Sequence, residues 1–70
     1  MRPGDLCRFK DGLSGSTVVE RCAGLTFMVL DVFTYSDGGR SINILIDGRT
    51  DPGWGGKWIE DNSEVLSEAG

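Results

Sequence analysis

The sequence predicts an all-β domain, a small barrel of five short strands, and three observations support this prediction. Glycine makes up 11 of the 70 residues, about twice its usual share, which favours many tight turns over a helical bundle. Stretches rich in β-branched and aromatic residues alternate with turn signals along the chain. A flat sheet of this size would leave long unpaired edges, whereas a closed barrel has none.

The first third of the chain predicts one short strand, a loop and an ambiguous segment. Residues 5–9 follow a Pro-Gly turn pair and mix the apolar Leu6 with the charged Arg8, which indicates a strand. The sequence DGLSGS at 11–16 is typical of a loop. The sequence TVVERC at 17–22 fits either one side of an irregular hairpin or a short strand, and the Ala-Gly pair after it ends the segment.

The middle of the chain predicts a β-hairpin. The sequence LTFMVLDVFTY at 25–35 is dense in β-branched and aromatic residues. Its residues 27–30 are apolar at both odd-numbered and even-numbered positions, as in a strand that is buried on both faces or bends sharply. The sequence SDGG at 36–39 supplies glycines for a tight turn. RSINILID at 40–47 then alternates, so the second arm is half exposed, and the first arm is long, bent and central.

The last third predicts a loop and two short strands. The sequence at 47–56, with four glycines and one proline, predicts the loop. Residues 57–60 predict a short strand around Trp58, residues 61–64 fit a single helical turn, and residues 64–68 predict the last strand. The predicted core consists of ten residues: Leu6, Phe27, Val29, Leu30, Val32, Ile42, Ile44, Ile46, Trp58 and Val65.

Length and charge limit the organisation and the class of the protein. Seventy residues predict a single domain over residues 1–70. The sequence has no apolar run long enough for a membrane span and no apolar core of a signal peptide, so we expect a cytoplasmic protein without membrane contact. The net charge of −4 is concentrated in residues 31–70, which contain eight acidic and three basic residues. This excess of negative charge makes nucleic acid an unfavoured partner.

The residue inventory argues against enzymatic chemistry. The chain has no histidine, so its serines, threonines and cysteines lack the usual base that would activate a nucleophile. Cys7 and Cys22 are interpreted as small apolar residues on strands, because two cysteines without histidine do not form a usual zinc set. We therefore expect no enzyme activity, no cofactor and no metal site.

The order of the signals resembles that of a known group of small barrels. The chain runs from PGDLCRFKDG at 3–12 through GLTFMVLDV at 24–32 and INILIDGR at 42–49 to KWIEDNSEVL at 57–66. This series resembles the SH3-like barrels, in particular short proteins encoded by tailed bacteriophages, and the opening is also similar to KOW-type modules. The resemblance implies a five-stranded SH3-like barrel, in host cytoplasm if viral. The longer segment 11–22 and the extra segment 50–56 depart from the pattern, at places where such barrels have ligand-contacting loops.

Aromatic and acidic residues predict a protein-binding surface. Trp54 lies between glycines, so nothing local buries it, and it is either an exposed interface anchor or a cover over the open end of the barrel. We expect a non-enzymatic interaction module that binds a protein partner through an aromatic and acidic surface, and such a surface suits a basic or proline-containing peptide. The predicted protein-binding residues are Tyr35, Asp51, Trp54, Trp58 and Glu60.

Two alternative functions stay open from the sequence. A KOW-like module would bind nucleic acid or ribonucleoprotein through basic residues, with a phenylalanine as a stacking ring. The residues for that function are Arg2, Arg8, Phe9, Lys10 and Arg21. A self-assembling structural subunit, a homo-oligomer, is the other alternative, because a domain this small is marginally stable alone.

Overall fold

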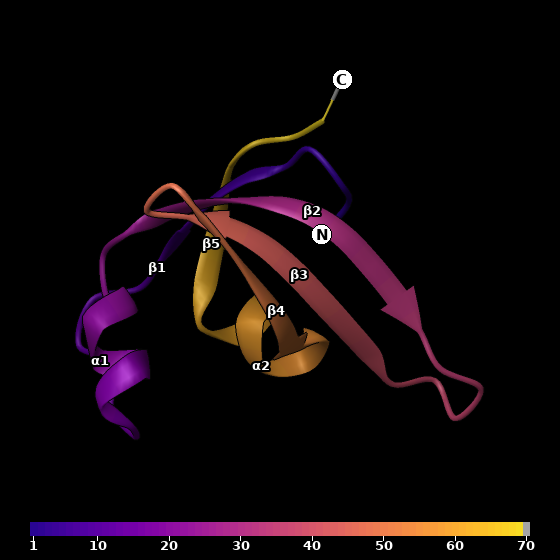
Figure 1. Cartoon of the computed structure of the whole chain (residues 1–70), viewed down its shortest axis with the longest axis horizontal. Coiled ribbons are helices and arrows are strands. Elements are labelled where there is room, and N and C mark those ends of the chain that lie inside the picture. Colours follow the sequence, from indigo (N-terminus) through magenta and orange to yellow (C-terminus); the bar gives the residue numbers. More distant parts are fainter. Residues whose placement is uncertain (70) are drawn as a thin grey trace.

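The computed structural model describes residues 1–69 and has five antiparallel strands in one sheet (Figure 1). The sequence predicted an all-β fold, and the structure is mostly β but also contains two short helices. The strand order is β4-β3-β2-β1-β5, so the last strand pairs with the first and lies at one edge, while β4 lies at the other. In chain order the elements are β1 (Leu6–Phe9), α1 (Thr17–Cys22), β2 (Thr26–Thr34), β3 (Arg40–Ile46), β4 (Arg49–Gly55), α2 (Gly56–Asp61) and β5 (Ser63–Ser67).

The central strand β2 carries a bulge that explains the continuous apolar run at 27–30. Val29 pairs with Ile44, but Asp31 pairs with Asn43, so Leu30 is an extra residue in β2. One extra residue shifts the inward face from odd to even positions. Val29 is accordingly buried before the bulge, whereas Val32 packs against the core after it. The strand is therefore long, central and interrupted by a bulge, and it is not buried on both faces.

The β2–β3 hairpin agrees with the prediction. The Tyr35 N–H donates to the Gly39 carbonyl at 2.7 Å, and Gly38 has a φ of +89°, a conformation that favours glycine. Strand β3 then alternates, with its three isoleucines buried and Leu45 on the opposite, exposed face. The face of β3 that carries the isoleucines is therefore the inner face of the sheet.

Residues 47–56 are not the predicted loop. Asp47 and Gly48 have φ values of +51° and +72°, which form a two-residue turn of the type that joins adjacent strands. Strand β4 follows directly and pairs with β3 from the Ile46–Arg49 pair to the Ser41–Gly55 pair. The prediction was wrong because an Asp-Gly turn outweighs the glycines and the proline that follow it.

Residues 17–22 form helix α1. Both predictions for this segment, one side of an irregular hairpin and a short strand, were wrong. Ser16 is the N-cap, and its hydroxyl accepts the Val19 N–H at 3.3 Å. Gly24 follows the helix with a φ of +76°, as is common after a helix C-terminus. Cys22 is buried on this helix, so only Cys7 of the two cysteines lies on a strand.

The predictions for residues 57–64 were also wrong. Helix α2 occupies the segment around Trp58, which was predicted as a strand, and strand β5 begins at Ser63, within the predicted helical turn. The Ser63 hydroxyl is buried and donates to the Ile59 carbonyl, so it joins the start of β5 to α2. Val65 is 43% exposed because β5 is an edge strand, and it does not belong to the core.

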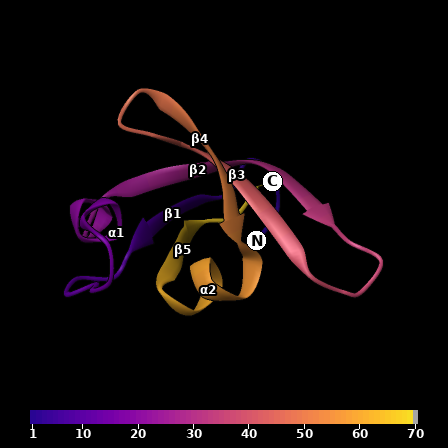
Figure 2. The ribbon, with the colours of Figure 1, turned by 60° about the horizontal axis from the view of Figure 1, so that its bottom comes forward.

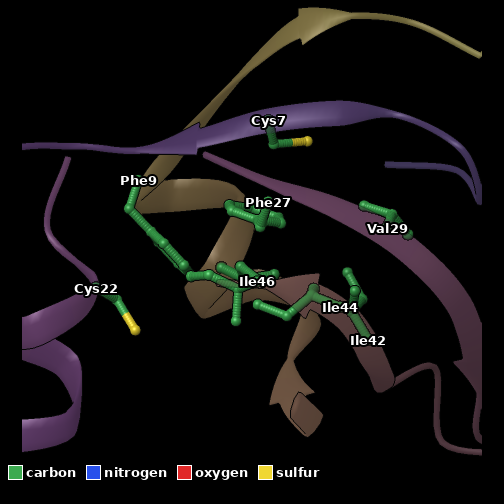
Figure 3. Packing of buried hydrophobic residues seen from close by; sticks show 9 residues of the cluster. Cys7, Phe9, Cys22, Phe27, Val29, Ile42, Ile44 and Ile46 are labelled. Carbon is green, nitrogen blue, oxygen red and sulfur yellow. The ribbon is translucent and has the colours of Figure 1, made fainter. Parts of the chain in front are cut away.

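The core lies on the inner face of the sheet, between the strands and the two helices (Figure 3). Leu6, Trp58 and Val65 were predicted to be buried but are exposed, and Leu30 and Val32 are only half-buried. Leu6 lies on the outer face because the inward positions of β1 are Cys7 and Phe9. The buried set is Cys7, Phe9, Cys22, Phe27, Val29, Ile42, Ile44, Ile46 and Ile59.

A buried carboxylate connects the two ends of the described chain. Asp5 is only 3% exposed, and its carboxylate accepts the Ala69 N–H at 2.7 Å and the Arg2 N–H at 2.9 Å. These two backbone hydrogen bonds, first that from Ala69, lower the pKa of Asp5 below its ordinary value of 3.8. The Asp5 N–H in turn donates to the Arg2 carbonyl, and the Gly4 N–H donates to Val29 on β2.

We expect Asp5→Asn to lower the thermal unfolding midpoint at pH 7. The folded-state pKa of Asp5 lies below its unfolded-state value, so its contribution is fully present above the unfolded-state value and is lost as the pH falls through the folded-state value. Circular dichroism melts at pH 7 and below pH 3 should therefore show a difference between parent and variant that shrinks in acid. Exposed Glu68→Gln is the control, and an equal effect of both variants would contradict the role of Asp5.

Candidate interaction site

Three aromatic rings from three elements meet at one side of the core. Phe9 of β1 lies 5.3 Å from Trp54 of β4 and 6.4 Å from Trp58 of α2, measured between ring centroids. The two indoles are stacked, with centroids 5.5 Å apart and planes 29° from parallel. Such ring pairs add about 0.5–1.5 kcal/mol beyond the area that they bury. We call Trp54 and Trp58 the tryptophan pair.

The position of Trp54 follows from an irregularity in β4. Ile44 pairs with Asp51 and Ile42 pairs with Trp54, so β4 has one more residue than β3 between these two pairs. Gly53, with a φ of +82°, lies in the bulge, and its N–H donates to the Asn43 side chain at 3.1 Å. Trp54 therefore points to the inner face and packs half-buried against the core, with its indole N–H buried and without a hydrogen-bond acceptor among residues 1–69.

Trp58 is the member of the tryptophan pair with the larger exposed surface. It is 37% exposed on α2, which packs against β3, β4 and β5 (Figure 2). The other face of α2 is fixed by Ile59, which is fully buried. One indole face of Trp58 therefore rests on Trp54, while more than a third of the residue surface faces solvent.

Two ion pairs lie on the same helix as Trp58. Glu60 forms an ion pair with Arg40 at the start of β3, and Lys57 contacts Asp61 at 3.1 Å. Lys10 donates to the Asp61 carbonyl at 3.0 Å. The acidic residues of α2 are therefore each paired with a base, and the charge around Trp58 is nearly balanced. This differs from the predicted aromatic and acidic surface.

The five residues predicted for protein binding fall into separate places. Trp54, Trp58 and Glu60 lie together around α2. Asp51 lies further along β4, opposite Ile44, where its negative charge acts on Cys22 of α1. Tyr35 is exposed at the end of the β2–β3 hairpin.

Arg40 also belongs to the site around α2, although it was not among the residues predicted for protein binding. Its side chain is paired with Glu60, which lies 20 positions later in the chain. A contact between residues so far apart leaves no local pattern in the sequence, so only the fold reveals it. Arg40 also lies against Gly56, at the beginning of α2.

The residues predicted for nucleic-acid binding do not form a free basic surface. Phe9 is fully buried, so its ring is not available to stack with a base. Arg8 contacts two carboxylates, Asp11 at 3.3 Å and Glu64 at 3.5 Å. Arg2 is exposed near the beginning of the chain, and Arg21 is exposed on α1, on a different element from Lys10, which lies beside α2.

The two cysteines are free thiols in the core. Cys7 and Cys22 are both buried and unbridged. Burial raises the pKa of each thiol above its ordinary value, and nearby carboxylates raise it further. Both residues therefore pack as small apolar side chains, as the sequence indicated.

Within residues 1–69 there is no enclosed pocket and no group of three or more metal-binding side chains. None of the described helices is long and apolar enough to cross a membrane. Comparison with protein families, with curated proteins and with solved structures finds no match to this chain.

We expect Gly56→Ala to destabilise the protein although alanine usually improves a helix by about 0.5–1 kcal/mol. A Cβ at this position would lie 2.7 Å from Arg40 Cβ and 3.3 Å from the Arg40 carbonyl oxygen. Overpacking of this kind costs about 1–3 kcal/mol, which exceeds the gain. Urea unfolding followed by tryptophan fluorescence measures the difference.

Gly55→Ala is the matched control for this experiment. A Cβ at Gly55 would meet only Trp58 Cβ at 3.8 Å, which is ordinary contact, so we expect a cost of about 1 kcal/mol or less, from the preference for glycine over alanine at an N-cap. Equal unfolding midpoints for the two variants would mean that α2 does not depend on its close approach to Arg40.

Proposed function

We propose that this protein is a non-enzymatic interaction module that binds a protein partner at the tryptophan pair. The observation that carries the proposal is that Trp58 is 37% exposed while its ring is stacked on Trp54. A tryptophan held in place by packing loses little conformational entropy on binding, and tryptophan is enriched among residues that dominate binding energy. Tyr35 and Asp51 lie away from the tryptophan pair, so the proposed surface does not include them.

The ligand that we propose is an extended peptide that contains proline and a basic residue. Aromatic surfaces recognise proline-containing segments because these are already extended and lose little entropy when bound. Glu60 and Asp61 follow Trp58 on α2 and are paired with Arg40 and Lys57, so they can orient a basic peptide without producing a large net charge at the site. The long-range attraction of the acidic chain, with net charge −4, adds to the association rate for a basic partner.

The SH3-like barrel belongs to the same proposal. Its support is the strand order among residues 1–69, in which β5 returns to pair with β1, so that β4 and β5 are the two outermost strands. Helix α2 joins these two edge strands directly and contacts both of them. The cytoplasmic location and the origin from a tailed bacteriophage rest on the sequence and on its resemblance to small phage barrels.

The KOW-like function, binding of nucleic acid or ribonucleoprotein, is the less favoured alternative. Its stacking residue Phe9 is buried, and Arg8 is already paired with two acids. Binding through the remaining bases would need to overcome repulsion by the acidic half of the chain.

A displayed library of short peptides with random sequence tests the proposed function. We expect selected peptides to contain proline and a basic residue and to change the tryptophan fluorescence, because both tryptophans of the chain lie in the site. Trp58→Ala should weaken binding at least tenfold, which is a loss of about 1.4 kcal/mol. Val18→Ala, on the exposed side of α1, is the matched control and should leave the affinity unchanged.

Two results would overturn the proposal. One is equal affinity of the parent and the Trp58→Ala variant, with the fold of the variant verified by circular dichroism. The other is binding of single-stranded nucleic acid that falls steeply with salt and is lost in Arg8→Gln or Lys10→Gln, which would establish the alternative function.

A further inference from the structure

The second half of β2 has a free edge. Strand β1 pairs with β2 only from Thr26 to Met28, and the Gly4 and Asp5 backbone extends this contact to Val29. Beyond that point β2 pairs only with β3 among residues 1–69, as far as Thr34. The hairpin projects away from the rest of the sheet, and no strand of the described part of the chain lies along its far side (Figures 1 and 2).

The backbone groups that face this free edge can be identified. The Tyr35 N–H donates to Gly39, so the Tyr35 backbone faces β3. In an antiparallel pair the backbone groups of successive residues point to alternate sides. Phe33 and Asp31 therefore also face β3, whereas Val32 and Thr34 direct their N–H and C=O groups to the open side. Each copy of the chain thus presents two donors and two acceptors there.

We propose that this edge is the pairing site for a second copy of the same chain, in a two-fold antiparallel arrangement centred on Phe33. In this register Val32 of each copy lies opposite Thr34 of the other copy, which gives two equivalent pairs. Both are hydrogen-bonded pairs, so four hydrogen bonds satisfy all four donors and all four acceptors. A shift by one residue would place inward side chains opposite outward ones.

The side chains fit the same register. Phe33 is 53% exposed on the outer face and lies opposite its own counterpart, at a position without hydrogen bonds where side chains approach most closely. On the same face Asp31 of one copy lies opposite Tyr35 of the other, so no like charges face each other. On the inner face Val32, which packs against the core, lies beside a threonine methyl group.

The outermost strands β4 and β5 carry more protection against strand addition than the free edge of β2. The edge strand β4 contains Pro52 and a bulge, and the edge strand β5 contains Glu64 and its own register shift. Proline, bulges and charges are the devices that prevent strands from adding to an edge. The segment 31–34, DVFT, begins after the bulge at Leu30, and within the segment the acid at its start is the single such device. A self-complementary segment of this composition selects a second copy as its partner.

Sedimentation equilibrium over concentrations up to about 1 mM tests the proposal, because an interface of one strand pair belongs to the weak class. We expect the mass to rise from 7.6 kDa towards twice that value. Phe33→Lys and Thr34→Pro should each raise the dimer dissociation constant at least tenfold. The first places like charges opposite each other, and the second removes a donor that β3 does not use.

Leu45→Lys is the matched control, because Leu45 is an exposed outer-face residue of β3 away from the free edge. It should leave the dissociation constant unchanged, and so should Trp58→Ala, which separates this inference from the proposed peptide site. In a mixture of isotope-labelled and unlabelled chains, nuclear magnetic resonance should detect proximity of the Phe33 Hα protons of the two copies. A constant mass of 7.6 kDa up to 1 mM, or a dimer that Leu45→Lys breaks and Phe33→Lys does not, would falsify the proposal.

Discussion

The fold depends on the burial of Phe9 at the point where four elements meet. The centroid of its ring lies 4.4 Å from that of Phe27 on β2, and the ring also packs against both tryptophans. Phe9 of β1 therefore connects β1 with β2, β4 and α2. A small domain has few such residues, since it buries only about 60% of its unfolded surface. The same ring that closes the core also supports the stacked indoles, and the rigidity of the proposed binding surface therefore comes from the core itself.

The sequence predicted those parts of the fold in which local pattern and tertiary structure agree. The alternation of the three isoleucines identified the inner face of β3, and the glycines at 36–39 identified the hairpin. The Asp47-Gly48 turn has an equally clear sequence signal, but the glycines after it led to the wrong prediction of a loop. Helix α1 had a signal in its N-cap Ser16, but six residues are too few to show helical periodicity.

The candidate site was only partly predictable, because its main contacts join distant positions. The two tryptophans were recognisable from their residue type, and their separation of four residues does not reveal that they are stacked, since one lies on a strand and the other on a helix. The pairing of Glu60 with Arg40 depends on the register of β3 against β4, and the bulge at Leu30 depends on the partner strand. None of these features has a sequence pattern of its own.

The carboxylate of Asp5 has a consequence for protein engineering. Because it holds Arg2 and Ala69 by one side chain, the chain enters and leaves the domain at the same place. Domains with adjacent ends tolerate insertion into a loop of a host protein and rearrangement of the chain order. A short linker between these ends would allow new termini at the exposed glycines of the β2–β3 turn, whereas a bulky fusion directly after Ala69 would compete with the hydrogen bond to Asp5.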